Sequence, residues 1–131
     1  MGVGVLWAQG DVDLDEGVLS SNMEAVAFIP VSDMLTSKVN DIACWHDAQE
    51  ETTYLLVGCE NGTAIFRLLP GARPIFMGKL PTASISSLWR DVKVVHDHAY
   101  VVSEAPTHGM QVLNLEALRS WMPLNGPVTW S

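Results

Sequence analysis

The sequence predicts an all-β protein. Short runs of β-branched and aromatic residues alternate with turn residues from residue 24 to residue 115, at the spacing of roughly 8 to 12 positions that is typical of sheet proteins. The runs also recur as an internal repeat of 46 to 50 residues. Four strands in about 45 residues is the size of a β-propeller blade. The predicted fold is therefore a β-propeller fragment of about two four-stranded antiparallel blades, with a flexible N-terminal tail and a short C-terminal helix.

The predicted elements divide the chain into three parts. Residues 1–22, rich in Gly and Asp, are predicted to be a flexible, poorly anchored tail, residues 23–119 to form the blades, and residues 120–131 to be a divergent C-terminal tail. The predicted strands cover 24–30, 40–45, 53–58, 63–68, 74–80, 90–95, 98–103 and 110–115.

Helix signals are weaker than strand signals. Leu115, Leu118 and Trp121 lie at helical spacing and predict a short helix over 115–121. The segment 23–28 could form one helical turn instead of the start of a strand.

The internal repeat appears when the chain is aligned with itself. Each unit contains an Asp-led strand, a hairpin, a Tyr-led strand, a glycine turn and an apolar strand, and the first unit adds a fourth strand at 74–80. The equivalent pairs are Asp41 with Asp91, Tyr54 with Tyr100, Gly62 with Gly109, Ile65 with Val112, and Leu68 with Leu115. The second unit therefore supplies three strands of a second blade. Several runs are apolar on both faces, as expected for a sheet that lies between two neighbouring blades.

Charge and hydropathy argue against two classes of partner. The chain has 15 acidic and 7 basic residues and a formal net charge of -8, which repels phosphate backbones, so no nucleic acid is expected as a partner. No apolar run approaches the roughly 20 residues that a membrane-spanning helix needs. The opening MGVGVLWA lacks a basic region and ends at Gln9, so it is not a clear signal peptide.

The two cysteines, Cys44 and Cys59, are compatible with several arrangements. Two thiols fit a reduced protein, a single disulfide, or two small buried residues. If 40–45 and 53–58 pair as a hairpin, Cys44 faces a residue near position 54, and Cys59 lies several residues out of register. Because that offset is too large for disulfide geometry, two free buried thiols are predicted.

Consecutive segments of the chain resemble a known family. The segments are NDIACW, YLLVGCENGTAIF, PIFMGKLPT, SSLWRDVKV, DHAYVVSEA and HGMQVLNLEALR. In residue identity, order and spacing they resemble the choice-of-anchor B proteins, whose chains carry LVIVD-type propeller repeats. The resemblance runs from Asn40 to about Arg119, some 80 of the 131 residues. The chain departs from the family pattern at Ala43, at LLPGARP and in the tail after Arg119.

The resemblance implies a location and a function. Because proteins of this family are mostly secreted or attached to the cell surface, it implies a non-enzymatic binding or scaffold module of an extracellular or cell-surface protein, with a protein or glycan partner and no cofactor. The family's remaining blades are absent, so the chain resembles the beginning of a propeller that cannot close a ring alone. Self-association or association with the missing blades is therefore expected. The alternative is an incomplete propeller enzyme or metal-binding protein whose site needs those blades.

The repeat places four polar residues at one end of the expected central channel. Asp41 and Asp91 are equivalent, and Asn40 and Arg90 stand beside them. A polar ring at the channel mouth could bind a ligand or a cation. Alternatively, each aspartate accepts hydrogen bonds from the backbone of its own turn and stabilises the blade. The structural interpretation is favoured, because a residue that recurs in each repeat is more often structural.

A second candidate group surrounds the loop SEAPTHG. Glu104 and His108 flank this loop and could form a metal or general-base pair, although a hydrogen bond that braces the loop is favoured. His98 lies at the far end of a strand of about 17 Å, so it cannot share a metal with His108. His96 is predicted to be a turn residue. No nucleophile, zinc, P-loop or dinucleotide motif is present, so no catalytic residue and no metal ligand is assigned.

Two surface features have both structural and functional interpretations. Asn61-Gly62-Thr63 predicts a tight hairpin turn, and it is also an acceptor sequence for N-glycosylation at Asn61 if the chain is secreted. Trp45, Trp89 and Trp121 could form a carbohydrate platform, but core positions are favoured for them.

Overall fold

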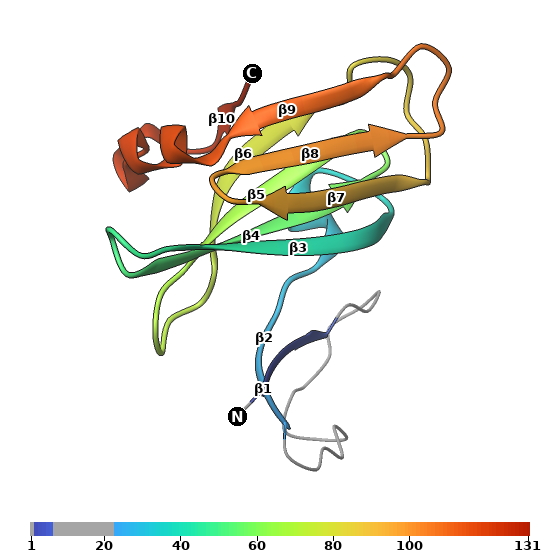
Figure 1. Cartoon of the computed structure of the whole chain (residues 1–131). Coiled ribbons are helices and arrows are strands. Elements are labelled where there is room, and N and C mark those ends of the chain that lie inside the picture. The colour runs from blue at the N-terminus through green and yellow to red at the C-terminus, as the bar shows by residue number, and fades with distance from the viewer. Residues whose placement is uncertain (1, 7–22) are drawn as a thin grey trace.

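The computed structural model describes residues 2–6 and 23–131, and over this part of the chain the protein is all-β with short 3₁₀ helices (Figure 1). The elements in chain order are β1 (Gly2–Leu6), β2 (Met23–Phe28), η1 (Val31–Met34), β3 (Val39–Asp47), β4 (Thr52–Cys59), β5 (Gly62–Leu68), β6 (Ile75–Pro81), β7 (Arg90–Val95), β8 (His98–Ser103), β9 (Met110–Asn114), η2 (Leu115–Ser120), η3 (Pro123–Asn125) and β10 (Val128–Thr129).

The strands form two larger sheets in which neighbours along the chain are neighbours in space. The first sheet has the order β10-β6-β5-β4-β3, and the second sheet has the order β7-β8-β9. Within these two sheets all pairs are antiparallel except β10 with β6. The second sheet lies in front of the first in Figure 1, and β3 and β7 contact each other at one side of the stack. A separate pair is made by β1 and β2, which run parallel.

The main core lies between the two larger sheets. Large side chains of the first sheet, including Tyr54 and Ile65, pack against smaller aliphatic side chains of the second sheet, including Val92 and Val101. Side chains of η2 and of Trp121 close one end of this layer. The buried residues of the layer are Trp45, Tyr54, Leu56, Ile65, Met77, Leu80, Val92, Ala99, Val101, Leu113, Leu115, Leu118 and Trp121.

The opposite face of the first sheet is also covered. Ile29 and Met34, from the segment around η1, pack on it and are almost fully buried. The buried strand residues beneath them are Leu55, Val57, Cys59, Ala64 and Phe66. The continuous apolar runs of β4 and β5 are therefore explained by burial on both faces of the first sheet.

The C-terminal segment returns to the first sheet. β10 pairs in parallel with β6, with Val128 opposite Gly78. Gly78 has φ 119°, and a Cβ atom there would collide with the backbone of Val128. Since only glycine accommodates this approach without strain, Gly78 is needed for β10 to reach the first sheet.

The structure agrees with the predicted strands and differs at two other places. The strand predicted over 24–30 is β2, which precedes the 3₁₀ helix η1, and the alternative helical turn over 23–28 is not formed. The helix expected over 115–121 is a 3₁₀ helix, η2. Within the predicted N-terminal tail, Gly2–Leu6 forms strand β1, while residues 1 and 7–22 lie outside the described residues.

Among the residues with a described structure, none of the helices has the length and apolar character needed to cross a membrane.

Candidate functional site

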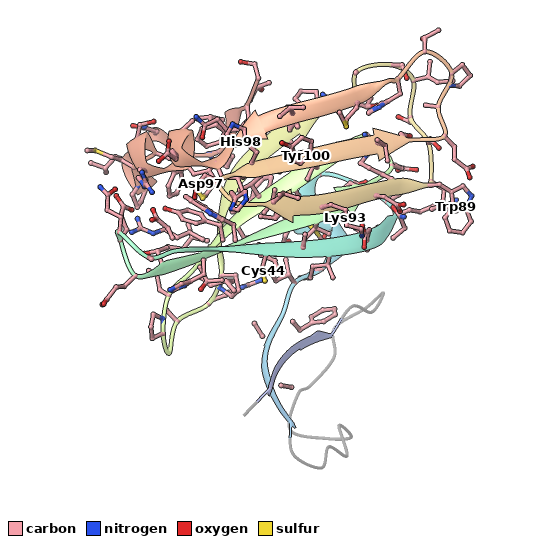
Figure 2. All side chains as sticks on the ribbon, in the orientation of Figure 1. Cys44, Trp89, Lys93, Asp97, His98 and Tyr100 are labelled. Atoms are coloured by element: carbon pink, nitrogen blue, oxygen red, sulfur yellow. The ribbon has the colours of Figure 1, made fainter. Side chains whose placement is uncertain are left out.

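The outer face of the second sheet is open. Along each strand of this sheet, every second residue faces the first sheet, and these residues are buried or half-buried in β7. The residues between them point away from the first sheet and form the outer face. Val112 keeps 51% of its surface exposed and Met110 keeps 59%. Figure 2 shows Lys93, His98 and Tyr100 on the strands of this sheet. The outer face consists of Asp91, Lys93, Val95, His98, Tyr100, Val102, Met110, Val112 and Asn114.

The internal repeat gives this outer face a counterpart. Tyr100 and Val112 occupy the repeat positions of Tyr54 and Ile65. Both of those residues are buried where the first sheet packs on the second. The outer face of the second sheet is thus equivalent to the face through which the first sheet packs on the second. In the described chain no element covers this outer face.

Asp41 shows how the two sheets are joined. Its carboxylate accepts a hydrogen bond of 2.7 Å from the backbone N–H of Val92, and Lys93 Nζ lies 3.5 Å away. Beside it, Asn40 Oδ1 accepts from the N–H of Arg90 at 3.2 Å. The prediction that Asp41 binds its own turn is therefore wrong, because its partner lies on the next sheet.

Asp91 is exposed, although it is the repeat equivalent of Asp41. It lies on the outer face of the second sheet, where Val102 is its neighbour on β8. The described chain places no further sheet over this face. The two aspartates therefore differ because one has a neighbouring sheet and the other does not.

Arg90 lies inside the protein and not on a polar surface at a channel mouth. Its side chain is fully buried. Nε donates to the carbonyl of Cys59 at 2.8 Å, and Nη2 donates to Thr82 Oγ1 at 2.8 Å. Nη1 lies 2.8 Å from His108 Nε2. Burial lowers the pKa of the guanidinium, and each of its three nitrogens has one hydrogen-bond acceptor.

His108 pairs with Arg90 rather than with Glu104. Because a guanidinium only donates, His108 Nε2 must accept, and the ring proton is assigned to Nδ1, which lies 3.0 Å from the carbonyl of Gly109. Glu104 is exposed, and its backbone N–H donates to the carbonyl of Trp89. The predicted Glu104–His108 pair is wrong. His108 instead contacts the buried guanidinium of Arg90, which links β7 of the second sheet to β4 of the first.

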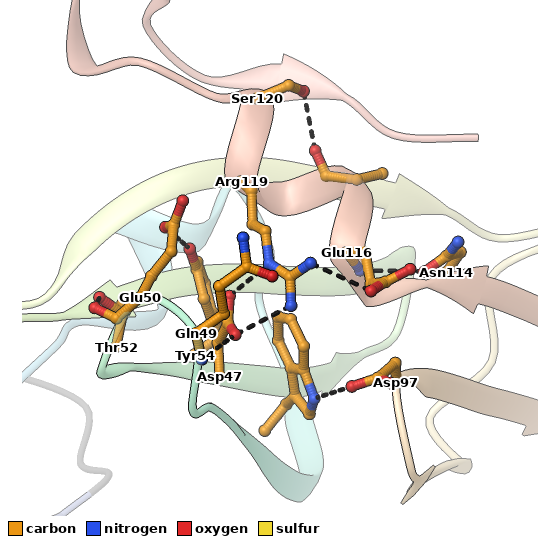
Figure 3. Close-up of polar contacts among 12 residues, drawn as sticks. Asp47, Gln49, Glu50, Thr52, Tyr54, Asp97, Asn114, Glu116, Arg119 and Ser120 are labelled. Carbon is orange, nitrogen blue, oxygen red and sulfur yellow. Dashed lines mark hydrogen bonds and ion pairs between the residues drawn. The ribbon is translucent and has the colours of Figure 1, made fainter.

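No sequence motif predicts the ion pair between Asp47 and Arg119, which Figure 3 shows. The guanidinium of Arg119, on η2, donates to the buried Asp47 carboxylate with N–O distances of 2.6 and 2.9 Å. The same guanidinium lies 5.7 Å from the ring centre of Trp45, and Trp45 Nε1 donates to Asp97 at 3.2 Å. Arg119 lowers the pKa of Asp47, and this carboxylate in turn raises the pKa of Arg119. The pair fastens η2 to the β3–β4 hairpin.

The three tryptophans do not form one platform. Trp45 and Trp121 are buried in the core between the sheets, while Trp89 is 57% exposed just before β7. The core interpretation therefore holds for Trp45 and Trp121. Trp89 adds an aromatic ring beside the end of the second sheet, as Figure 2 shows.

Asn61 lies at the β4–β5 turn, as predicted. Its Nδ2, the atom that would carry a glycan, donates to the carbonyl of Leu35 at 2.9 Å. Its Oδ1 accepts from Lys79, whose pKa is lowered by burial. The side chain thus braces three segments of the fold.

The cysteines are both free, but only one is buried. Cys44 is exposed on β3 opposite Leu55, and Cys59 is buried opposite Val39. The prediction of two buried thiols is wrong for Cys44, because it lies on the face of β3 opposite to the buried Trp45 and Asp47. His96 lies in the predicted turn, with φ 51°.

No metal-ligand cluster is present in the part of the chain that the structure describes, where three His, Cys, Asp or Glu side chains do not gather at any point. The open face described above therefore remains the best-defined candidate site. Comparison of the chain with protein-family models, with curated proteins and with solved structures finds no match.

Proposed function

We propose that the chain is a non-enzymatic binding or scaffold module of the choice-of-anchor B type, acting within an extracellular or cell-surface β-propeller protein. In this proposal the two stacked sheets are consecutive blades. The outer face of the second sheet is the surface that receives the next sheet or a protein partner.

The observation that carries the proposal is the difference between Asp41 and Asp91. Asp41 accepts a backbone N–H from the neighbouring sheet, and its repeat equivalent Asp91 stands exposed on a face with the same arrangement. A partner strand that presents a backbone N–H to Asp91 would reproduce the observed contact. Tyr100 and Val112 would then be buried as Tyr54 and Ile65 are.

The chemistry of the outer face favours a protein over a small ligand. Its apolar side chains include Val102, which is 42% exposed, and Val112, which is 51% exposed, and Asp91 and Lys93 lie on the neighbouring strand β7. Exposed apolar patches of several hundred Å² are typical of protein contact surfaces. A small molecule would need a concave site, and a flat sheet face does not provide one.

Dye binding and Val102→Glu test this face. The unmodified chain should bind a dye that reports apolar surface, and Val102→Glu should lower the dye signal several-fold. Leu124→Glu is the matched control, because Leu124 is 98% exposed on η3, away from the sheet. A chain that binds no dye and gives a sharp monomer peak with cooperative unfolding would contradict the proposed docking face.

The proposed location is tested at Asn61. Expression behind a eukaryotic signal peptide should add one glycan mass, which Asn61→Gln should remove. Because Nδ2 of Asn61 is engaged by Leu35 in the folded chain, attachment must precede closure of this turn. A secreted chain without the added mass would argue against the acceptor.

A further inference from the structure

Strand β9 has an open edge. In the described chain β9 pairs only with β8, whereas its repeat equivalent in the first sheet, β5, pairs with β4 on one side and β6 on the other. After β9 the chain turns into η2 and then places β10 on the first sheet. The second sheet therefore lacks the fourth strand that the first sheet has.

The backbone groups of this edge can be assigned. Leu115 N–H donates to the carbonyl of Asp97, and hydrogen-bonded pairs alternate along an antiparallel ladder. Because Leu115 bonds toward β8, the N–H and C=O groups of Met110, Val112 and Asn114 point to the open edge.

The first sheet shows the same alternation with its fourth strand in place. Thr82 N–H donates to the carbonyl of Asn61, so Thr63 and Ile65 are the β5 residues that bond to β6. Their repeat equivalents are Met110 and Val112. The backbone groups left open on β9 are thus those that hold a fourth strand in the first sheet.

The β9 edge also lacks the residues that usually protect an edge strand. Its sequence, MQVLN, contains no charged residue and no proline. By contrast, β3 and β7 carry charged residues, and β6 is covered by β10. An exposed edge without charge, proline or cover is prone to pair with another strand.

The chain contains a strand suited to this edge. β1 has the sequence GVGVL, and its segment VGVL matches MGKL of β6 in the positions of glycine and leucine. Within the residues that the structure describes, β1 pairs only with β2, in a two-stranded parallel sheet. Such an isolated pair is marginally stable, so β1 can leave β2 at low cost.

We propose that β1 of one copy adds to the open edge of β9 in a second copy, as the antiparallel fourth strand of the second sheet. If β1 follows the β5–β6 register, Gly4 lies opposite Val112 and Leu6 lies opposite Met110. Residues 7–22 join β1 to β2, and a linker of that length can span up to about 50 Å. The exchange can be reciprocal, which gives a closed dimer.

Disulfide trapping between two differently tagged chains tests the contact and its register. One chain carries Leu6→Cys, the other carries Met110→Cys, and both carry Cys44→Ser because Cys44 is the exposed native thiol. Mild oxidation of the mixture should give a covalent heterodimer, since opposed residues of an antiparallel pair lie within disulfide range. A mixture of Leu6→Cys with Val95→Cys is the control and should give much less. Equal or absent crosslinking would overturn the proposal.

Sedimentation of non-covalent complexes provides the second measurement. Val112→Pro removes an N–H that the free edge does not use, so the monomer should fold while the dimer dissociation constant rises about tenfold or more. Deletion of residues 1–6 should have the same effect, and Val112→Thr, which keeps the N–H, should not. Val102→Glu alters the outer face and should leave this dimer intact, which separates strand addition from the docking face proposed above. A dimer that survives deletion of residues 1–6 would contradict the role of β1.

Discussion

The first and second sheets share a repeat and a strand order but differ in what surrounds them. The first sheet is covered on one face by the second sheet, on the other by the segment around η1, and along its outer edge by β10. The second sheet is covered on one face only, and its β9 edge is open. Equivalent residues therefore lie in opposite environments, as Ile65 and Val112 do. The repeat thus places equivalent residues on a covered face in the first sheet and on an open face in the second.

Removing the contacts of Arg90 between the two sheets should lower the free energy of unfolding more than any other change considered below. Arg90→Ala leaves a cavity and removes the donors to Cys59, Thr82 and His108. The free energy of unfolding should fall by roughly 3 kcal/mol or more, measured by denaturant titration.

Arg73→Ala is the matched control for Arg90→Ala. Arg73 forms an exposed ion pair with Asp33, at 2.9 Å. Exposed pairs contribute little, so the free energy of unfolding should change by less than about 1 kcal/mol. Similar losses in the two variants would show that the buried cation does not join the sheets.

The pair of equivalent aspartates tests the comparison directly. Asp41→Ala leaves the N–H of Val92 without its acceptor and should cost about 1 to 3 kcal/mol of unfolding free energy. Asp91→Ala removes an exposed side chain and should change this free energy by less than about 0.5 kcal/mol. Equal losses in thermal or denaturant unfolding would mean that Asp91 already has a partner in the isolated chain.

The Asp47–Arg119 ion pair predicts a smaller, pH-dependent effect. Arg119 lowers the pKa of folded Asp47 below its unfolded value. The stabilisation is therefore fully present above the unfolded pKa, and it is lost as the pH falls below about 4 and through the folded pKa. Asp47→Asn should lower the melting temperature at pH 7 and show a weaker further loss in acid. Parallel melting curves for both proteins from pH 7 to pH 3 would contradict this.

Substitution of the exposed cysteine should have the smallest effect on stability. Cys44 is exposed, while Cys59 is buried and burial raises the pKa of its thiol. Because thiolates react and buried thiols are shielded, a thiol reagent should modify one cysteine in the folded protein and two in denaturant. Cys44→Ser should abolish the fast reaction without a change in melting temperature. Two fast thiols in the folded protein would indicate that β4 opens readily.

Local sequence signals were sufficient for most of the fold. Period and turn residues predicted β3 to β9 within about two residues, because each strand is bounded by a strong turn signal such as Asn61-Gly62. The 3₁₀ character of η2 and the return of β10 to β6 were not predictable. Both depend on tertiary contacts, including the approach of Val128 to Gly78.

The candidate site was less predictable than the fold. The repeat makes Asp41 and Asp91 equivalent, but the partner of Asp41 lies on another sheet, and local sequence cannot show such a contact. Arg90 and His108 belong to two different candidate groups in the sequence, and their pairing depends on how the β8–β9 loop folds back over β7. Asp47 and Arg119 carry no common motif, and they are 72 positions apart.

That separation has a consequence for synthesis. Asp47 leaves the ribosome well before Arg119, and at about 5 to 20 residues per second the interval lasts several seconds. During this time the β3–β4 hairpin can form, but the Asp47 carboxylate lacks the guanidinium that it binds in the folded protein. Docking of η2 on the β3–β4 hairpin is therefore a late step of folding. A nascent chain halted before Arg119 should leave this hairpin accessible to proteases and chaperones.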